Sequence, residues 1–175
     1  MDQVSEAANS PGPGLTTVQF ARSVPMSTYL VCFIVCDFDH LPPIKSKSGF
    51  DVSVYARRDQ IRKMEYSQQI AVSTINYYID YFGVPYSLPK LDLIAIPDFV
   101  SGAMENWGLI TFRETSILYD PDFSSTSNHL GVTLTTNHEL AHMWFGDLVT
   151  MKWWDDLWLN EGFATFMAAK ASAHN

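Results

Sequence analysis

The spacing of hydrophobic residues predicts several strands in the first hundred residues. Apolar and polar residues alternate over residues 50–55, which is typical of a strand with one exposed face. Residues 16–20 and 27–38 also have the pattern of strands, and the second is apolar on both faces, as in a strand buried in a sheet. A further strand is predicted at residues 91–96, where Pro97 ends it.

The spacing becomes helical from residue 59 onward. Apolar residues recur at helical intervals up to Phe82, and the sequence Gly-Val-Pro at residues 83–85 ends this long helix. Two more helices are expected further along: one ends at residues 144–146, and Asn160 suits the cap of the other. Strands, a long helix, more strands and then two helices indicate an α+β fold.

Length, composition and charge limit the classes of function. The 175 residues are 47 % hydrophobic, enough for one domain with a real core. The net charge of −8, with a compact basic group only at residues 57–63, argues against nucleic acid as a partner. The longest apolar stretch, residues 29–36, is far too short to span a bilayer, so no transmembrane segment is predicted. Residues 1–14 are expected to form a flexible leader.

Two cysteines, Cys32 and Cys36, lie in the predicted strand at residues 27–38. At extended spacing they are about 13 Å apart, too far for a disulfide between them. They are therefore predicted to be packed thiols. A zinc site built on this pair is the alternative, but no second pair follows and the surroundings are those of a strand.

The clearest chemical signal is an HEXXH motif, His138-Glu139-Leu140-Ala141-His142. Residues four apart on a helix lie about 40° from one another, so the two imidazoles can face one ion. Neutral imidazole suits zinc, and Glu139, about 100° further round, is placed to take a proton from the attacking water. The alternative is an amphipathic helix whose two histidines face solvent or fill a polar gap in the core.

A third metal ligand is predicted at Glu161, in the first turn of the second helix. Residues 147–159 are long enough to turn and bring this helix back antiparallel, so that the carboxylate faces the two histidines. Compensation of the helix dipole by a first-turn glutamate is the alternative. Three protein ligands would leave the fourth position of a zinc ion open, as catalysis requires.

A second motif lies in a loop that enters the apolar pair Leu109-Ile110, and its sequence is Gly102-Ala103-Met104-Glu105-Asn106. Taken alone, it indicates a hairpin edge with one exposed carboxylate. Together with the HEXXH motif and the sequence Asn160-Glu161-Gly162-Phe163-Ala164, however, it closely resembles the zinc aminopeptidases of the aminopeptidase N and oxytocinase type. The resemblance extends from about residue 20 to residue 166. Residues 47–49 and 52–56 look most like the oxytocinase branch, which includes the endoplasmic reticulum aminopeptidases.

The resemblance implies a thermolysin-like catalytic domain that binds one Zn²⁺ ion and hydrolyses the first peptide bond of peptides with a free N-terminus. By resemblance, the zinc ligands are His138, His142 and Glu161, and the general base is Glu139. Glu105 would bind the α-ammonium group of the substrate. The rest of its loop would lie beside the peptide: Gly102, Ala103, Met104 and Asn106. A carboxylate at a fixed distance from the reacting centre selects the first peptide bond, which disfavours an endopeptidase.

Three residues around the HEXXH motif are unusual for the family: Asn137, Met143 and Asp147. Met143 and Asp147 stand where the family usually has Gln and Asn, and neither is an expected metal ligand. Asp147 adds negative charge near the end of the zinc helix, where the helix dipole disfavours it. Asn137 is expected to lie at the start of that helix and to be harmless there.

By the same resemblance, residues 15–39 correspond to the last strands of an N-terminal β domain and residues 40–175 to the first part of the catalytic domain. The family's transition-state tyrosine would lie beyond Asn175. The sequence therefore predicts a truncated catalytic domain. Its unpartnered apolar residues, Phe163, Phe166 and Met167, would favour association with another chain.

Two questions of function stay open at the level of the sequence. A catalytically inactive fragment, which binds zinc, peptide or a full-length relative, is the alternative to an active enzyme. Relatives are membrane-bound, in the endoplasmic reticulum or cytoplasmic, and these residues do not choose among the three locations.

Overall fold

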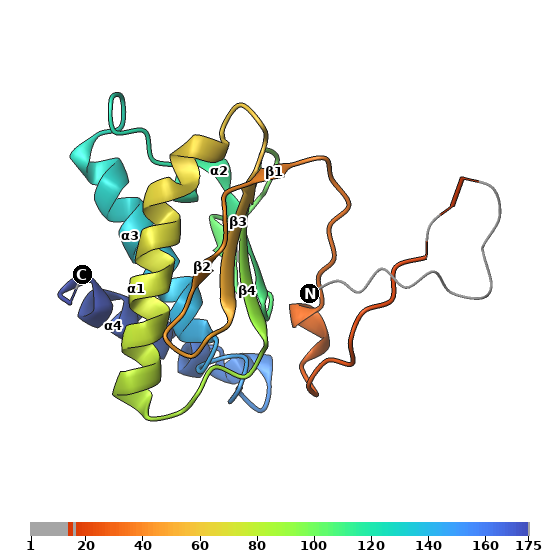
Figure 1. Ribbon diagram of the computed structural model, residues 1–175. Helices are drawn as coiled ribbons and strands as arrows, with labels where there is room; N and C mark the ends of the chain where they lie inside the picture. Colours follow the sequence, from red (N-terminus) through yellow and green to blue (C-terminus); the bar gives the residue numbers. More distant parts are fainter. Residues whose placement is uncertain (1–13, 16, 175) are drawn as a thin grey trace.

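The computed structural model describes residues 14–15 and 17–174, in which helices cover one face of a mixed sheet (Figure 1). The sheet has six strands in the order β1-β3-β4-β6-β5, and β2 also pairs with β3. The strands are β1 Asp39–His40, β2 Ile44–Lys45, β3 Asp51–Ala56, β4 Lys90–Ile96, β5 Ala103–Met104 and β6 Leu109–Arg113. The α-helices are α1 Glu65–Phe82, α2 Glu114–Ile117, α3 Thr126–His142 and α4 Trp158–Ser172. Three short 3₁₀ helices are η1 Thr28–Leu30, η2 Ile61–Met64 and η3 Trp154–Asp156. The predicted α+β class is confirmed.

The centre of the sheet is formed by β3, β4 and β6, which run parallel to one another. Val54 pairs with Leu93 and Leu93 with Ile110, so these three side chains share one face of the sheet, and all are fully buried. Helix α1 packs on this face with Ile75 and Tyr78, which are also fully buried. The apolar sides of the helix and of the strands therefore form one core. A helix was predicted at residues 61–82 and a strand at residues 91–96, and both contribute to it.

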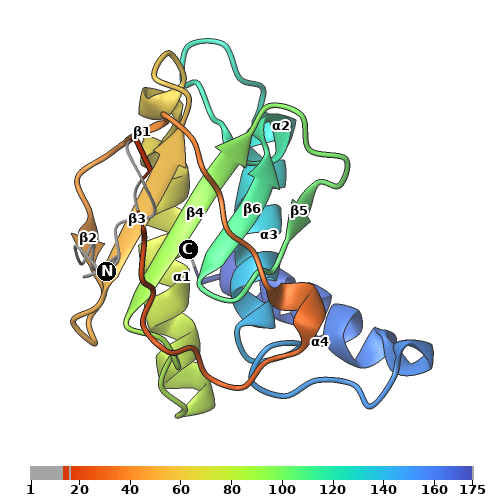
Figure 2. The same cartoon turned by 90° about the vertical axis from the view of Figure 1, so that its right-hand side faces the viewer.

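The other face of the sheet is buried in part. Ser53, Ile94 and Thr111 point to this side, and their exposed fractions are 7 %, 3 % and 2 %. Figure 2 shows the N-terminal segment crossing this face before it enters β1. The strand at residues 50–55 was predicted to be half exposed. Asp51 and Tyr55 on its polar side are partly exposed, as predicted, whereas Ser53 on the same side is buried.

The strands predicted at residues 16–20 and 27–38 were wrong for the part of the chain that is described. Gln19 makes one isolated bridge and η1 is the only helix of these segments, and Val31, Phe33 and Val35 have exposed fractions of 66 %, 77 % and 93 %. An apolar pattern makes a strand only where a neighbouring strand completes the ladder. The predicted leader at residues 1–14 lies, apart from Gly14, outside the described residues.

The two cysteines lie in the segment that was wrongly predicted to be a strand. Cys32 is partly exposed and Cys36 is exposed, and both are free thiols. The prediction of packed thiols was therefore wrong for Cys36, because the segment that carries it has no sheet to pack in.

Helix α1 ends as predicted, at Gly83. This glycine has φ +63° and its N–H donates to the carbonyl of Ile79, so a left-handed residue closes the helix where glycine is least strained. Helix α3 begins much earlier than the HEXXH motif, at Thr126, and Ser125 Oγ caps it by accepting from the N–H of Asn128. Asn137 is therefore a fully buried interior residue and not a residue of the helix start.

Helix α4 begins at Trp158, with Leu157 at the N-cap position. Asn160 lies inside the helix and was wrongly predicted as its cap. Met167 is buried, with an exposed fraction of 3 %, and the prediction that it lacks partners was wrong. Phe163 and Phe166 are exposed to 43 % and 61 %, although the Phe163 ring stacks on Phe145. None of the helices in the described part of the chain is long and apolar enough to cross a membrane.

Candidate functional site

The side chains of His138, His142 and Glu161 meet between α3 and α4. The distance from His138 Nε2 to His142 Nε2 is 3.0 Å, and from His138 Nε2 to Glu161 Oε2 it is 3.2 Å. His142 Nε2 lies 3.6 Å from the same carboxylate oxygen. Two ligands one helical turn apart and a third from the returning helix thus come together, as the sequence pattern predicted.

These three atoms have the separations that a zinc ion needs. Ligand atoms at about 2.0–2.2 Å from a tetrahedral ion lie roughly 3.3–3.6 Å from one another. The observed separations of 3.0–3.6 Å fall close to that range. The donor set of two imidazoles and one carboxylate therefore fits one zinc ion and leaves a position for substrate or water.

The tautomer of His142 also supports a metal site. Its Nδ1 lies 2.7 Å from the carbonyl oxygen of Phe145, and a carbonyl only accepts, so Nδ1 carries the hydrogen. In the neutral ring, Nε2 then presents a lone pair toward His138 Nε2. Two ring nitrogens at this distance need a proton or a metal cation between them, and the backbone contact orients the ring as it does for metal-bound histidines.

The charges around the histidines favour a cation. Burial by itself lowers the pKa of His142, but the hydrogen bond to Glu161 and the nearby Glu105 and Glu139 outweigh it and raise the pKa to about 9. Hydrogen bonds from His138 and His142 hold the pKa of the Glu161 carboxyl well below its usual range. The protein therefore stabilises positive charge at the point where the three side chains meet.

Glu139 lies beside this cluster in a dry environment. Its exposed fraction is 6 %, and its Oε2 atom has no hydrogen-bond partner among the described residues. Burial, together with Glu105 and Glu161, raises its pKa to about 8, although His142 acts in the opposite direction. A carboxyl group with a pKa near neutrality is suited to both taking and giving a proton.

Glu105 approaches the same cluster from the loop between β5 and β6. Ligand atoms of Glu105, Glu139 and His142 all lie within 4.8 Å of one another. The exposed fraction of Glu105 is 6 %, so the alternative of a hairpin edge with an exposed carboxylate was wrong. The fold thus brings two motifs that are separate in the sequence to one point.

Hydrogen bonds hold this loop in place. Thr111 Oγ1 donates to Asn106 Oδ1 at 2.8 Å, and Asn106 Nδ2 donates to the Leu30 carbonyl at 3.3 Å. The N–H of Arg113 donates to the carbonyl of Gly102. The side chain of Asn106 is therefore used to fix the loop that carries Glu105. Ala103 and Met104 form the edge strand β5 of the sheet.

Two residues near the site were not predicted to contribute to it. Asn160 is 1 % exposed; its Oδ1 accepts from the N–H of Met151, and its Nδ2 donates to Tyr29 Oη and Thr150 Oγ1. Burial and the nearby Glu105 raise the pKa of Tyr29 to about 12. Asn160 could have been noticed as the neighbour of Glu161, but no local pattern indicates a contact between residues 29 and 160.

Asp147 is the third buried carboxyl group of the site. Its exposed fraction is 6 %, and neither carboxyl oxygen has a hydrogen-bond partner within the described residues. Burial and the neighbouring Glu105 raise its pKa to about 9. The raised pKa disfavours the negative charge that the sequence predicted for Asp147 near the helix end.

Replacing Asp147 by asparagine, which has nearly the same shape but cannot ionise, is expected to change how stability depends on pH. The folded pKa of Asp147 lies above its usual value of 3.8, so its contribution to stability is fully present below about pH 4 and is lost as the pH rises toward 9. The loss is at most about 1.4 kcal/mol per pH unit in that window. Urea unfolding of the chelator-treated chain at pH 5, 7 and 8.5 should show a shallower decline for Asp147→Asn. Parallel pH profiles would contradict the buried, protonated carboxyl.

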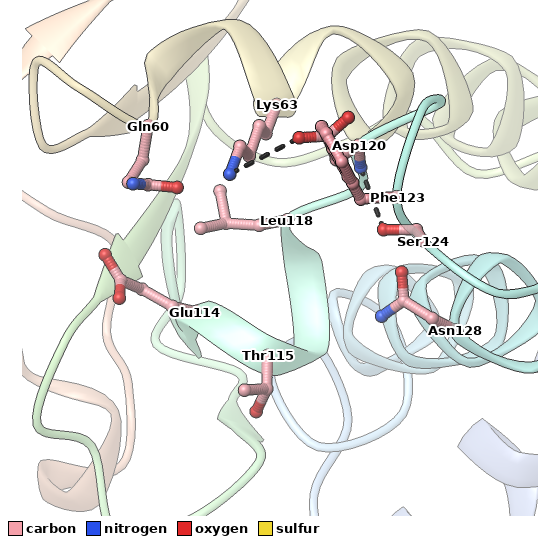
Figure 3. A pocket seen from close by; sticks show the side chains of 9 residues that line it. All are labelled: Gln60, Lys63, Glu114, Thr115, Leu118, Asp120, Phe123, Ser124 and Asn128. Carbon is pink, nitrogen blue, oxygen red and sulfur yellow. Dashed lines mark hydrogen bonds and ion pairs between the residues drawn. The ribbon is translucent and has the colours of Figure 1, made fainter.

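A separate pocket of about 420 Å³ lies near the beginning of α3. Figure 3 shows its lining, which includes Lys63 paired with Asp120 and the carboxylate of Glu114. Asn128 of this pocket precedes His138 by ten residues, about 15 Å along the helix. Its charges are paired and it is remote from the histidines, so it has no part in the site.

The sequence has clear relatives. The model of the peptidase family M1 domain matches residues 66–175. The chain is 58 % identical to endoplasmic reticulum aminopeptidase 1 of Rattus norvegicus over 154 residues, which cover 88 % of this chain and 16 % of that protein. It is 58 % identical to glutamyl aminopeptidase of Bos taurus over 147 residues, or 84 % of this chain and 15 % of that protein. It is 56 % identical to endoplasmic reticulum aminopeptidase 2 of Homo sapiens over 154 residues, with the same coverage as the first.

The chain spans about one sixth of the length of these relatives. The match nevertheless includes α1, the loop of Glu105, and both helices of the site. The predicted resemblance to zinc aminopeptidases, including those of the endoplasmic reticulum, is confirmed. This chain belongs to peptidase family M1.

Proposed function

We propose that this chain carries the site of a zinc-dependent aminopeptidase that hydrolyses the first peptide bond of peptides with a free N-terminus. The observation that supports it most is the position of Glu105, whose carboxylate lies within 4.8 Å of Glu139 and His142. A buried carboxylate so near the reacting centre favours substrates that bring a positive charge to it. The relatives are named as aminopeptidases, which agrees with this proposal.

His138, His142 and Glu161 are the proposed zinc ligands, on the strength of their separations and of the His142 tautomer. When bound, zinc supplies Lewis acidity to the scissile carbonyl group and to the attacking water. The residues themselves supply the orientation. The Phe145 carbonyl holds the ring of His142, and α4 presents the carboxylate of Glu161 from the opposite side.

Glu139 is the proposed general base. Its buried carboxyl group takes a proton from the attacking water and later gives it to the leaving amine, which a pKa of about 8 allows in both directions. The surrounding side chains exclude bulk water from Glu139, as its exposed fraction of 6 % indicates. The proton therefore stays with the reacting groups.

Glu105 is the proposed anchor for the substrate's α-ammonium group, and the backbone of residues 102–106 lies beside the peptide. Strand β5 is at the edge of the sheet, so its outer N–H and C=O groups can pair with an extended substrate. Anchoring the ammonium at a fixed distance from Glu139 places the first peptide bond, and no later one, at the reacting groups.

The proposal also covers the domain organisation and the cellular location of the protein. Residues 15–39 are assigned to the end of an N-terminal β domain and residues 40–175 to the thermolysin-like catalytic domain. The names of two of these relatives support an endoplasmic reticulum location for the protein. Exposed Trp153, Trp158 and Phe166 support contact with further polypeptide, either of the same protein or of another chain.

Glu105→Gln tests the amine anchor. The variant keeps the shape of the side chain but loses the charge, so KM for an aminoacyl fluorogenic amide should rise at least about tenfold, because a charge-assisted hydrogen bond is worth about 1.5–3 kcal/mol. Steady-state kinetics at pH 7.5 would measure it.

An Nα-acetylated version of the same amide is the matched control. It has no ammonium group for Glu105 to bind, so its slow hydrolysis should be the same in the parent and in Glu105→Gln. An unchanged KM for the free amine would contradict the role of Glu105.

A further inference from the structure

A chain of hydrogen bonds joins α1, α3 and α4 in the core behind the metal site. Thr74 Oγ1 donates to Asn137 Oδ1 at 2.6 Å, and Asn137 Nδ2 donates to Ser172 Oγ at 3.0 Å. Tyr78 Oη donates to the backbone carbonyl of Asn137 at 3.0 Å. Asn137, Thr74 and Tyr78 are fully buried, so one side chain of α3 connects both neighbouring helices.

Asn137 directly precedes His138 but points about 100° away from it around the helix. The metal site and the polar core contact therefore lie on different sides of the same turn of α3. A displacement of this turn would move both, since the helix backbone is rigid over one residue.

Helix α4 packs along α3 through apolar side chains, and polar side chains also join the two helices near both ends of α4. Near its beginning, Glu161 contacts His138 and His142, and near its end, Ser172 contacts Asn137. These two points lie eleven residues apart on α4, about 16 Å along its axis. Directional contacts at both ends of α4 add to the apolar packing and help to fix the direction of the helix.

We propose that Asn137 is a positioning residue for the metal site, which holds α4 across α3 so that Glu161 stays at ligand distance from His138 and His142. The proposal rests on the proposed function only for the identity of the three ligands. It gives a role to a residue that departs from the family pattern.

The energetics explain why this contact can specify geometry. A buried donor without an acceptor is costly, and α4 in another direction would take Ser172 Oγ away from Asn137 Nδ2. An apolar pair at these positions would tolerate sliding, since apolar contact is not directional. A fully bonded polar network instead selects one arrangement of the three helices.

Zinc affinity of the full chain tests the proposal, measured by competition with a chromophoric chelator. Asn137→Ala and Ser172→Ala should bind zinc about tenfold or more weakly, the usual effect of removing a group that orients a metal ligand. Ser172→Thr keeps the hydroxyl and should keep the parent affinity. Lys170→Ala is the matched control, because Lys170 lies over the Tyr81 ring and ties the same end of α4 to α1 alone.

Two results would overturn the proposal. One is a zinc Kd within twofold of the parent in folded Asn137→Ala and Ser172→Ala, whatever happens to their melting temperatures, since a purely structural role predicts that outcome. The other comes from amide hydrogen exchange measured without zinc. The proposal predicts that the first turn of α4 exchanges faster in Ser172→Ala than in Lys170→Ala. Equal exchange rates in the two variants would contradict a positioning role for the contact between Asn137 and Ser172. A parent chain that binds no zinc would contradict the metal site of the proposed function, and the exchange rates would still decide the role of Asn137.

Discussion

Glu139→Gln is expected to lower the turnover of unblocked aminoacyl amides by about 10²- to 10⁴-fold, the usual contribution of a general acid–base group. The amide has nearly the same shape and can fill the same buried space, but it cannot accept a proton at neutral pH. Glu139 is not among the three proposed ligands, so the variant should still bind one zinc ion per chain. Initial rates and zinc content measured on the same preparation would show the two effects together.

The matched control for this change is Asp122→Asn, which makes the same carboxyl-to-amide replacement at an exposed position. Its turnover should equal that of the parent. Turnover of Glu139→Gln within threefold of the parent would mean that another group handles the proton.

His138→Ala and Glu161→Gln are expected to weaken zinc binding by at least about a hundredfold each. Removing a group that only orients a metal ligand costs about 10- to 100-fold, and removing the ligand itself costs more. Both side chains contribute one atom to the cluster of 3.0–3.6 Å separations, so each variant leaves only two protein ligands. Chelator competition at pH 7.5 would measure the dissociation constants.

His129→Ala is the control for the loss of a histidine from the same helix. His129 packs between Tyr66 and Tyr119, at the other end of α3 from the metal cluster. Its removal should affect stability and leave zinc affinity unchanged. If Glu161→Gln bound zinc as tightly as this control, a carboxylate from another part of the chain would have to be the third ligand.

The regular core could be predicted from the sequence because its signals are local. The helical spacing that ends at Gly83 and the apolar run at residues 91–96 each determine their own element, and both were predicted closely. The residues before β1 were mispredicted because their apolar pattern is not matched by a neighbouring strand. The burial of Ser53 on the polar side of β3 was not predicted, because a distant segment crosses this face and no local pattern indicates it.

Some features of the candidate site also follow from local sequence patterns, and others do not. The HEXXH spacing sets two imidazoles on one helix face, so their meeting follows from helix geometry alone. The contact of Asn160 with Tyr29 joins residues 131 positions apart and has no local signature. The raised pKa of Asp147 depends on burial among other carboxyl groups, and the proposed roles of Asn137 and Ser172 depend on how α4 crosses α3.

The most direct test compares the zinc-loaded parent chain on an aminoacyl fluorogenic amide and on its Nα-acetylated counterpart. We expect the free amine to be hydrolysed and the acetylated amide to be cut far more slowly, because Glu105 binds the ammonium group that only the first substrate has. Stoichiometric zinc without turnover of the free amine would contradict the proposed aminopeptidase function. Equal rates on both substrates would contradict the assignment of Glu105.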